Sequence, residues 1–211
     1  MLAIPEPSGI THHNDNLYIV SDANGTIFKT DLKGAIIEKI KTPFKDIEGI
    51  AIEEETGSIW IVNEQNRKLL RVNNKGNAVK KIDVKGKQQH KNSGLEGVCF
   101  VRENHTFYII NEKKPKQLLL LDVKGRLIQK IKIGFAKDIS GISFDEVSKT
   151  LWVVSDESQQ VYQTTLKGAL LKLYNIPVKK AEGVTVYKNS IYVVSDSENT
   201  LYLFKKPHLR N

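Results

Sequence analysis

The sequence has little of what builds helices, membrane spans or disulfide frameworks. Its one cysteine, Cys99, excludes an intramolecular disulfide and lacks the Cys or His neighbours of a zinc site, so we expect it to be a small buried residue. No apolar run approaches the roughly 20 residues that cross a bilayer, and no charged-then-apolar leader precedes Pro5. No segment repeats apolar residues at a helical period. We therefore expect a domain of strands without a signal or transmembrane segment.

Catalytic motifs and arginine are scarce as well. The sequence contains no Gly-x-Ser-x-Gly elbow, no phosphate-binding glycine loop and no paired-histidine metal motif. The formal net charge is +8, yet arginine occurs only at positions 67, 71, 102, 126 and 210. Because bidentate recognition of bases and phosphates favours arginine, we do not expect nucleic acid as a partner. The lysines predict a solvated basic face, and the alternative is peripheral contact with an anionic membrane.

A module of two strands occurs five times along the chain. Each copy opens with Ser-Gly or Glu-Gly before a short apolar strand, at Ser8, Glu48, Glu96, Ser140 and Glu182. Each first strand is followed by a second strand of aromatic and aliphatic residues that ends in Ser-Asp or Asn-Glu. The acidic residues of these endings are Asp22, Glu64, Glu112, Asp156 and Asp196. A period of about 40 residues made only of strands is typical of a β-propeller.

The repeats predict an all-β, five-bladed propeller of four-stranded antiparallel blades within a single domain, residues 1–211. We expect the blades at about residues 8–42, 47–84, 95–133, 139–176 and 181–205. The last repeat stops after three strands, and residues 1–5 resemble the segment before Glu182. The N-terminal strand is therefore expected to complete the last blade, which would close the ring and remove its open edge.

The first strand of every repeat carries glycine directly after its opening residue. These glycines are Gly9, Gly49, Gly97, Gly141 and Gly183. Side chains alternate across a strand, so the small residues of each first strand face one neighbouring blade and the branched residues face the other. This pattern allows the inner strands to converge on an axis, and a large residue in place of any of these glycines is expected to disrupt the hub.

The recurring Glu/Ser-Gly-Ile/Val strand, followed by a strand ending Ser-Asp or Asn-Glu, resembles the SdiA-regulated (YjiK-like) family of bacterial β-propellers. The resemblance covers nearly the whole chain. It implies a propeller that is commonly exported or tethered through an N-terminal segment, and hence an extracytoplasmic location, with no settled biochemical activity. The chain is more distantly similar to NHL-repeat, phytase-like and gluconolactonase-type propellers.

The same resemblance suggests a metal site, because a Glu at the mouth of an inner strand helps to hold a divalent cation in gluconolactonase-type propellers. Glu48, Glu96 and Glu182 occupy similar positions here. Three carboxylates converging on an axis repel one another, and Ca²⁺ accepts carboxylate, hydroxyl, carbonyl and water ligands with loose geometry. We predict a calcium site of Glu48, Glu96, Glu182 and the Ser8 and Ser140 hydroxyls. The alternative is that each Glu accepts main-chain hydrogen bonds without a metal.

The ends of the second strands should lie on the same acidic face as these glutamates. The further candidates for ligand contact on this face are Asp22, Asn63, Glu64, Asn111, Glu112, Asp156 and Asp196. The near-equivalence of the repeats favours a non-enzymatic protein that binds a protein or small-molecule ligand at the acidic face. We expect this protein to be a monomer. The alternative is a metal-dependent hydrolase of the lactonase, esterase or phosphoesterase type, whose catalytic residues the sequence leaves unknown.

Overall fold

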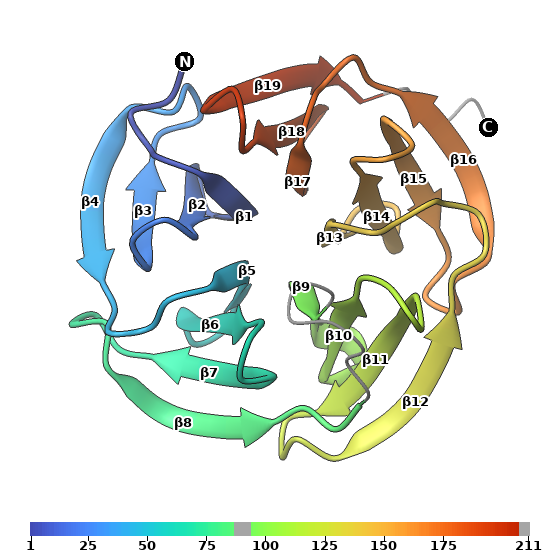
Figure 1. Cartoon of the computed structure of the whole chain (residues 1–211), viewed down its shortest axis with the longest axis horizontal. Coiled ribbons are helices and arrows are strands. Elements are labelled where there is room, and N and C mark those ends of the chain that lie inside the picture. The colour runs from blue at the N-terminus through green and yellow to red at the C-terminus, as the bar shows by residue number, and fades with distance from the viewer. Residues whose placement is uncertain (87–93, 207–211) are drawn as a thin grey trace.

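The computed structural model describes residues 1–86 and 94–206, and it forms five antiparallel sheets arranged as blades around a central axis (Figure 1). Strand order follows chain order from the axis to the periphery, so the first strand of each blade lines the centre. The chain is thus a five-bladed β-propeller, as the sequence predicts. Its helical content in the described part is one 3₁₀ turn, Arg102–Asn104, and no helix there has the length and hydrophobicity to span a membrane.

The strands of blades one and two are β1 (Pro7–His13), β2 (Asn16–Ser21), β3 (Thr26–Thr30), β4 (Ile36–Lys41), β5 (Ile47–Glu53), β6 (Ser58–Asn63), β7 (Lys68–Val72) and β8 (Ala78–Asp83). Those of blades three to five are β9 (Leu95–Val101), β10 (Thr106–Asn111), β11 (Gln117–Asp122), β12 (Leu127–Lys132), β13 (Gly141–Asp145), β14 (Thr150–Ser155), β15 (Gln160–Thr164), β16 (Leu170–Asn175), β17 (Ala181–Tyr187), β18 (Ser190–Ser195) and β19 (Thr200–Lys205).

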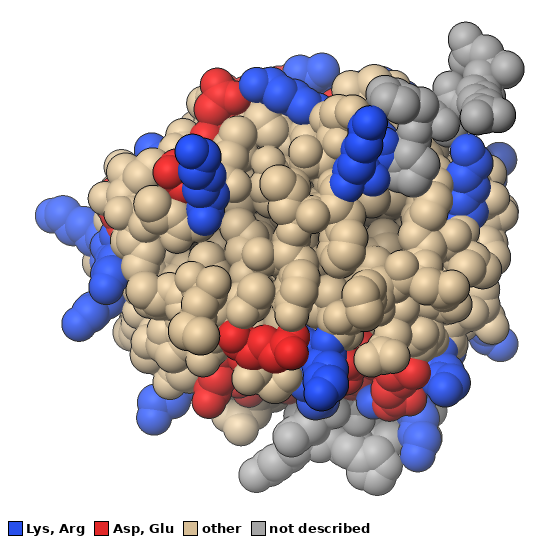
Figure 2. Space-filling model, turned by 90° about the horizontal axis from the view of Figure 1, so that it is seen from above, with Lys and Arg blue, Asp and Glu red and all other residues tan. Residues whose placement is uncertain are grey.

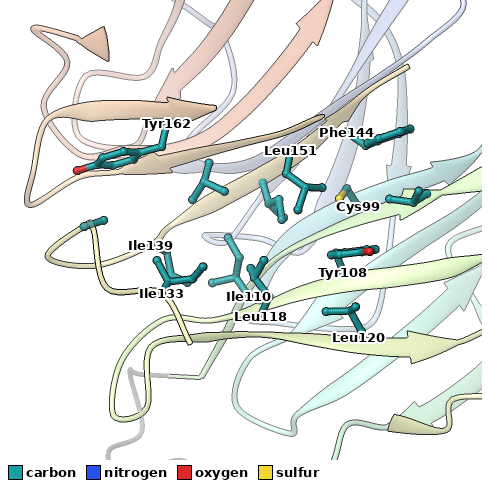
Figure 3. Packing of buried hydrophobic residues seen from close by; sticks show 14 residues of the cluster. Cys99, Tyr108, Ile110, Leu118, Leu120, Ile133, Ile139, Phe144, Leu151 and Tyr162 are labelled. Carbon is teal, nitrogen blue, oxygen red and sulfur yellow. The ribbon is translucent and has the colours of Figure 1, made fainter. Parts of the chain in front are cut away.

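The hydrophobic core lies between neighbouring blades. Figure 3 shows one such layer, in which Cys99 and Tyr108 of blade three face Phe144 and Leu151 of blade four. Cys99 is buried and free, as expected, and burial raises the pKa of its thiol. Because each apolar face of a blade is covered by the next blade, the ring is stabilised by a series of interfaces, and each interface contributes about 25 cal/mol per Å² of apolar surface removed from water.

The glycines of the first strands bring neighbouring blades into backbone contact at the axis. A Cβ atom on Gly49 would lie 2.7 Å from the Cα of Gly97, and one on Gly141 would lie 2.8 Å from the Cα of Gly183. Real Cβ atoms do not approach other atoms this closely, so the inner strands converge only because these positions lack side chains. The structure thus confirms that these glycines recur because the inner strands converge on the axis.

Blade five is the exception to the four-stranded pattern. In the described part of the chain it has three strands, β17 to β19, and residues 1–6 form no strand beside them. The N-terminal segment does lie against this blade, because the Leu2 N–H donates to the Asn199 carbonyl at 2.6 Å and Leu2 and Ile4 are buried beside Val194. One backbone hydrogen bond does not make a paired strand, and the predicted closing strand is not confirmed.

Candidate functional site

The predicted glutamates stand at bulges in the innermost strands. The pairing of β5 with β6 steps from Ile47 to Gly49, so Glu48 is an extra residue without a partner on β6. Glu96 and Glu182 are the extra residues of β9 and β17 in the same way. A β-bulge bends the strand and redirects the side chain of the extra residue, and here it turns carboxylates toward the axis.

These carboxylates line a cavity of about 350 Å³ at one mouth of the central channel, which we call the acidic mouth. Its described lining residues are Glu6, Ser8, Asp22, Asp46, Glu48, Glu64, Glu96, Glu112, Lys113, Lys180, Glu182 and Asp196. Nine of these twelve residues are acidic, although the chain as a whole carries a net charge of +8. Figure 2 shows the molecule from its edge, with acidic side chains gathered mainly along the lower rim and basic ones spread more widely.

Burial and mutual repulsion perturb the titration of this cluster. Burial, followed by the nearby Asp22 and Glu64 carboxylates, raises the pKa of Glu48 well above its usual value. The pKa of Glu96 is raised well above its usual value by burial and then by Glu48. Burial also raises the pKa of Glu182 to about 7, against a smaller opposing effect of Lys180. The folded protein therefore holds carboxyl groups that resist ionisation near neutral pH unless a cation compensates their charge.

Among the acidic residues that follow the second strands of the blades, Glu64 is the most buried, with 6% of its surface exposed. Burial raises the pKa of Glu64 to about 7, even though the Gly94 N–H donates to its carboxylate at 2.8 Å. The pKa of Asp22, Glu112 and Asp196 is also raised, in each case chiefly by burial. The acidic mouth is thus an array of carboxylates with few internal donors.

Three of the carboxylates are close enough to share one ion. The oxygens of Asp22, Asp46 and Glu48 lie within 4.8 Å of one another. Two ligands that each stand about 2.4 Å from one calcium ion are at most about 4.8 Å apart, so the three groups fit a single coordination sphere. Asp46 has a positive φ of 62°, and its second oxygen accepts from the Gln65 N–H at 2.7 Å, which fixes the orientation of its carboxyl group.

The structure brings most of the predicted site residues together, but it gives some of them other contacts. Glu48, Glu96, Glu182 and Ser8 all line the acidic mouth, as do the ligand candidates Asp22, Glu64, Glu112 and Asp196. Ser140 is not among the described lining residues; it is buried just before β13, where its N–H donates to the Val154 carbonyl at 2.9 Å.

Asn63, Asn111 and Asp156 are occupied within the protein. Asn63 Nδ2 donates to the Lys45 carbonyl at 2.5 Å. Asn111 Nδ2 donates to the Pro115 carbonyl at 2.8 Å, and its Oδ1 accepts from Arg67 at 2.9 Å. Asp156 forms an ion pair with Lys180 at 3.5 Å. The asparagines therefore shape the loops that lead into the acidic mouth.

Sequence reasoning did not select Asp46, Glu6, Lys113 and Lys180 as site residues. Asp46 and Lys180 stand two positions before Glu48 and Glu182, and Glu6 stands two positions before Ser8. All three have positive φ angles, between 42° and 62°, which turn the chain into the bulge. An alignment of the repeats shows this shared position, two residues before the opening residue, and could have identified Glu6, Asp46 and Lys180 as site residues. Lys113 carries no such signal, and it enters the site by pairing with Glu112 at 2.8 Å and Glu157 at 2.7 Å.

Comparison with known proteins supports the fold and a family. A family model described as SdiA-regulated matches residues 4–205. The solved structure of glutaminyl cyclase from Myxococcus xanthus is similar with a TM-score of 0.75 at 12% identity, over 96% of this chain and 90% of that chain. The solved structure of a protein of unknown function from Bacteroides caccae is similar with a TM-score of 0.66 at 10% identity, over 95% of this chain and 78% of that chain.

Virginiamycin B lyase from Staphylococcus aureus is also similar, with a TM-score of 0.56 at 17% identity, over 93% of this chain and 68% of that chain. At these identities the likeness to solved structures shows the propeller fold alone.

Proposed function

This chain belongs to the SdiA-regulated family of β-propellers, and we propose that it is a non-enzymatic binding protein that holds a calcium ion at its acidic mouth and presents that mouth to a ligand. The observation that carries the proposal is the group of Asp22, Asp46 and Glu48 oxygens within 4.8 Å of one another. Glu96, Glu182 and the Ser8 hydroxyl line the same cavity. They would supply further oxygen ligands, either directly or through water.

Electrostatics favours a bound cation over an empty cluster. Two ionised carboxylates about 5 Å apart repel by about 3 kcal/mol at an effective dielectric constant of 20. Lys113 and Lys180 offset part of this charge, yet each of them is paired with carboxylates at the edge of the mouth. Calcium suits the remaining array because it takes six to eight oxygen ligands in flexible geometry, whereas Mg²⁺ requires a tight octahedron.

Several features support binding over catalysis. The described residues that line the acidic mouth include no histidine or cysteine, and the one hydroxyl there, that of Ser8, donates to the Ile47 carbonyl at 2.9 Å and not to a carboxylate that could activate it as a nucleophile. One calcium ion neutralises two charges of the nine acidic side chains there. The ligand of the filled mouth would accordingly carry cationic groups, such as the amines or guanidinium groups of a protein or small molecule.

An extracytoplasmic location is part of the proposal, because the calcium sites of extracellular modules have dissociation constants of about 0.1 to 1 mM, weaker than those of cytosolic buffers and sensors. A site with modest affinity would be filled there and empty in a cytoplasm. The family membership is compatible with this location.

Calcium is expected to stabilise the protein against heat. With a dissociation constant of about 10 µM, calcium at about 1 mM adds roughly 2.7 kcal/mol to the free energy of unfolding, because it binds only the folded state. For a chain of this size the melting temperature should rise by about 5 to 10 °C relative to a sample in EDTA. Differential scanning calorimetry measures the shift, and magnesium at the same concentration should give a smaller one.

Glu48→Gln should abolish most of the calcium effect, because it removes a charged ligand from the three-carboxylate group. Glu55→Gln is the matched control, since Glu55 is an exposed residue of the β5–β6 turn that does not line the mouth. Identical melting curves in calcium and in EDTA would refute the metal site. Calcium-dependent turnover of lactones, aryl esters or phosphoesters that is lost in Glu48→Gln would instead establish the hydrolase and refute the binding function.

A further inference from the structure

The central channel has a second cavity at the end away from the acidic mouth. Between the two, the five first-strand glycines and the Ile or Val after each of them narrow the free space to about 10 Å³, which admits at most about one water. Beyond this hub lies a cavity of about 40 Å³, which we call the basal chamber, and its described lining residues include Thr11, His12, Glu54, Ser143, Glu146 and Thr185. Residues of all five first strands line it, and these strands surround the centre in Figure 1. The basal chamber is therefore a site separate from the acidic mouth.

One position of the first strands supplies a ring of small side chains to this chamber. The position lies two residues after the hub glycine, and in every blade it pairs with an aromatic residue of the second strand, as Ser143 does with Trp152. The five residues at this position all line the basal chamber, and they are Thr11, Ala51, Cys99, Ser143 and Thr185. Three of them carry hydroxyl groups, so the repeat gives the chamber groups that can form hydrogen bonds.

The hydroxyl of Ser143 marks a place for a ligand. Ser143 is 4% exposed, and its Oγ finds no hydrogen-bond partner among the described residues. The Thr185 hydroxyl in the next blade does find one, because it lies 3.1 Å from Nδ1 of His12. A buried hydroxyl without a partner costs folding free energy, and Ala51 at the same position shows that a blade packs here without a hydroxyl. Ser143 therefore indicates that a hydrogen-bonding group enters the chamber.

The charges around the chamber favour a cationic group. Two carboxylates, those of Glu54 and Glu146, line it, and its described lining residues include no lysine or arginine. His12 does not supply a fixed positive charge, since burial lowers the pKa of its imidazole. Glu146 is already paired with Lys149 at 2.8 Å. Glu54 is paired with the His13 imidazole at 3.0 Å, which is charged only when it is protonated. Glu54 thus has negative charge to offer to a ligand.

Aromatic rings and a wider cleft complete the surroundings. Phe100 and Phe144 line the basal chamber. The faces of aromatic rings attract ammonium groups, and the Nζ of Lys149 already lies 5.8 Å from the centre of the Phe144 ring. A cleft of about 210 Å³ adjoins the chamber, because Glu54 and Phe100 line both, and it adds two further glutamates and Arg102. A ligand can therefore place its charged end in the chamber and its remaining part in the cleft.

The size of the chamber and its acceptors identify the kind of cation. One water needs about 10 to 15 Å³ of such free volume, so the chamber holds a group of only a few non-hydrogen atoms. A divalent metal ion is not favoured, because among the described residues the group of His, Cys, Asp or Glu side chains that can share an ion is the one at the acidic mouth. A primary ammonium group carries three N–H donors on one small charge, so it can donate to a hydroxyl and a carboxylate together.

We propose that the basal chamber binds the primary ammonium group of an alkylamine, which donates to the Ser143 hydroxyl and the Glu54 carboxylate while its alkyl chain lies against Phe100 in the cleft. Hydrogen bonds to charged groups are stronger than those between neutral groups, so the ammonium group supplies most of the affinity. The amine is a free small molecule or the side chain of a lysine residue, since the two share this chemistry. The site does not depend on calcium at the acidic mouth, because the hub lies between them.

A titration of the full chain with n-butylammonium chloride, followed by ¹H–¹⁵N NMR spectroscopy, tests the proposal. The amide signals of Thr11, Ser143 and Thr185 should shift saturably, because these residues line the chamber. n-Butanol has nearly the same shape and no charge, and it should bind at least about tenfold more weakly. Equal binding of the two compounds, shifts confined to residues of the acidic mouth, or no saturable shift of the chamber signals would each overturn the proposal.

Nα-acetyl-L-lysine N-methylamide in the same titration distinguishes the two sources of the amine. Binding of this compound at the chamber signals would show that the site admits a lysine side chain carried by a polypeptide. Binding of n-butylammonium without it would assign the site to a free amine.

Two variants locate the contacts. Ser143→Ala should weaken n-butylammonium binding about tenfold, because a hydrogen bond to the charged group is lost, while Ala51 shows that the ring accepts alanine. Glu54→Gln should weaken it by about the same factor, and the exposed position of this side chain leaves the packing intact. Ser197→Ala is the matched control, since Ser197 is an exposed residue of the β18–β19 turn that lines neither the chamber nor the cleft. Wild-type affinity in Ser143→Ala would show that water alone meets this hydroxyl, and would refute the site.

Discussion

Replacing Gly49 by valine should prevent the protein from folding. A Cβ atom at this position would lie 2.7 Å from the Cα of Gly97 and 2.9 Å from the nitrogen of Val98, and both are backbone atoms of the next blade. Neither can move aside without displacing β9, which is held by its own pairing with β10. Overpacking a well-packed core commonly costs about 1 to 3 kcal/mol and occasionally more. Here three added carbons meet backbone that cannot yield as a side chain does, so the cost should exceed the roughly 5 kcal/mol by which a marginal domain is stable.

Alanine at the same position gives a graded result. We expect Gly49→Ala to fold with a loss of about 3 kcal/mol in the free energy of unfolding, measured by urea titration and circular dichroism. Gly134→Ala is the matched control, because nothing lies within 4 Å of a Cβ atom there and its φ is not in the left-handed region. Wild-type stability in Gly49→Val would show that the inner strands do not converge as the structure places them.

Lowering the pH from 8 to 5 should stabilise the metal-free protein. A carboxyl group whose folded pKa is raised binds more protons in the folded state than in the unfolded state between the two pKa values, so stability falls as the pH rises through that window. For Glu182 and Glu64 the folded pKa is about 7 against an ordinary value of 4.5. The stabilisation should therefore be lost as the pH rises through about 7 and be fully present below about 4.5.

Glu182 alone should contribute about 2 to 3 kcal/mol between pH 8 and pH 5, since one pKa unit corresponds to 1.36 kcal/mol. Glu48 and Glu96 add to this in the same direction. His12 opposes it, because burial lowers the pKa of its imidazole and the unfolded chain takes up a proton near pH 6.5. The carboxyl groups outnumber this histidine, and urea denaturation in EDTA at several pH values measures the balance.

Calcium should flatten this pH dependence, because a bound cation stabilises the ionised carboxylates and displaces their protons. The largest calcium effect is expected at pH 8 and the smallest at pH 5. Glu182→Gln should remove part of the slope in EDTA, whereas Glu55→Gln, an exposed residue away from the mouth, should not. A stability of the metal-free protein that rises with pH across this range would contradict the assigned pKa shifts.

The fold could be predicted almost completely because its signals are local and repeated. Each Glu-Gly or Ser-Gly pair, each alternating strand and each turn glycine specifies the same supersecondary unit, and five such units leave few arrangements other than a ring. The glycine hub followed from the same pattern, since Gly9, Gly49 and their equivalents recur at one strand position. The closing strand could not be settled in this way, because residues 1–5 contain the end contact at Leu2 and not the paired strand.

The site could be predicted in its location and only partly in its membership. Glu48, Glu96 and Glu182 were placed at the mouth by their strand position, which is a property of the repeat. The grouping of Glu48 with Asp22 and Asp46 depends on the bulge at Glu48 and on the left-handed backbone at Asp46. Neither feature follows from hydrophobic periodicity, because the bulge stands at the start of β5, where Ile47 alone precedes it and the alternation is too short to show a change of phase.

By itself the sequence determined the blade count, the order of strands, the glycine-lined axis and the acidic character of one mouth. All of these follow from the composition and spacing of one repeat and from the number of times that it recurs along the chain. Only the tertiary structure decided which carboxylates lie within reach of one ion and which side chains meet in the basal chamber. Those outcomes depend on distances between residues that belong to different blades, and such distances are set by how the blades pack around the axis.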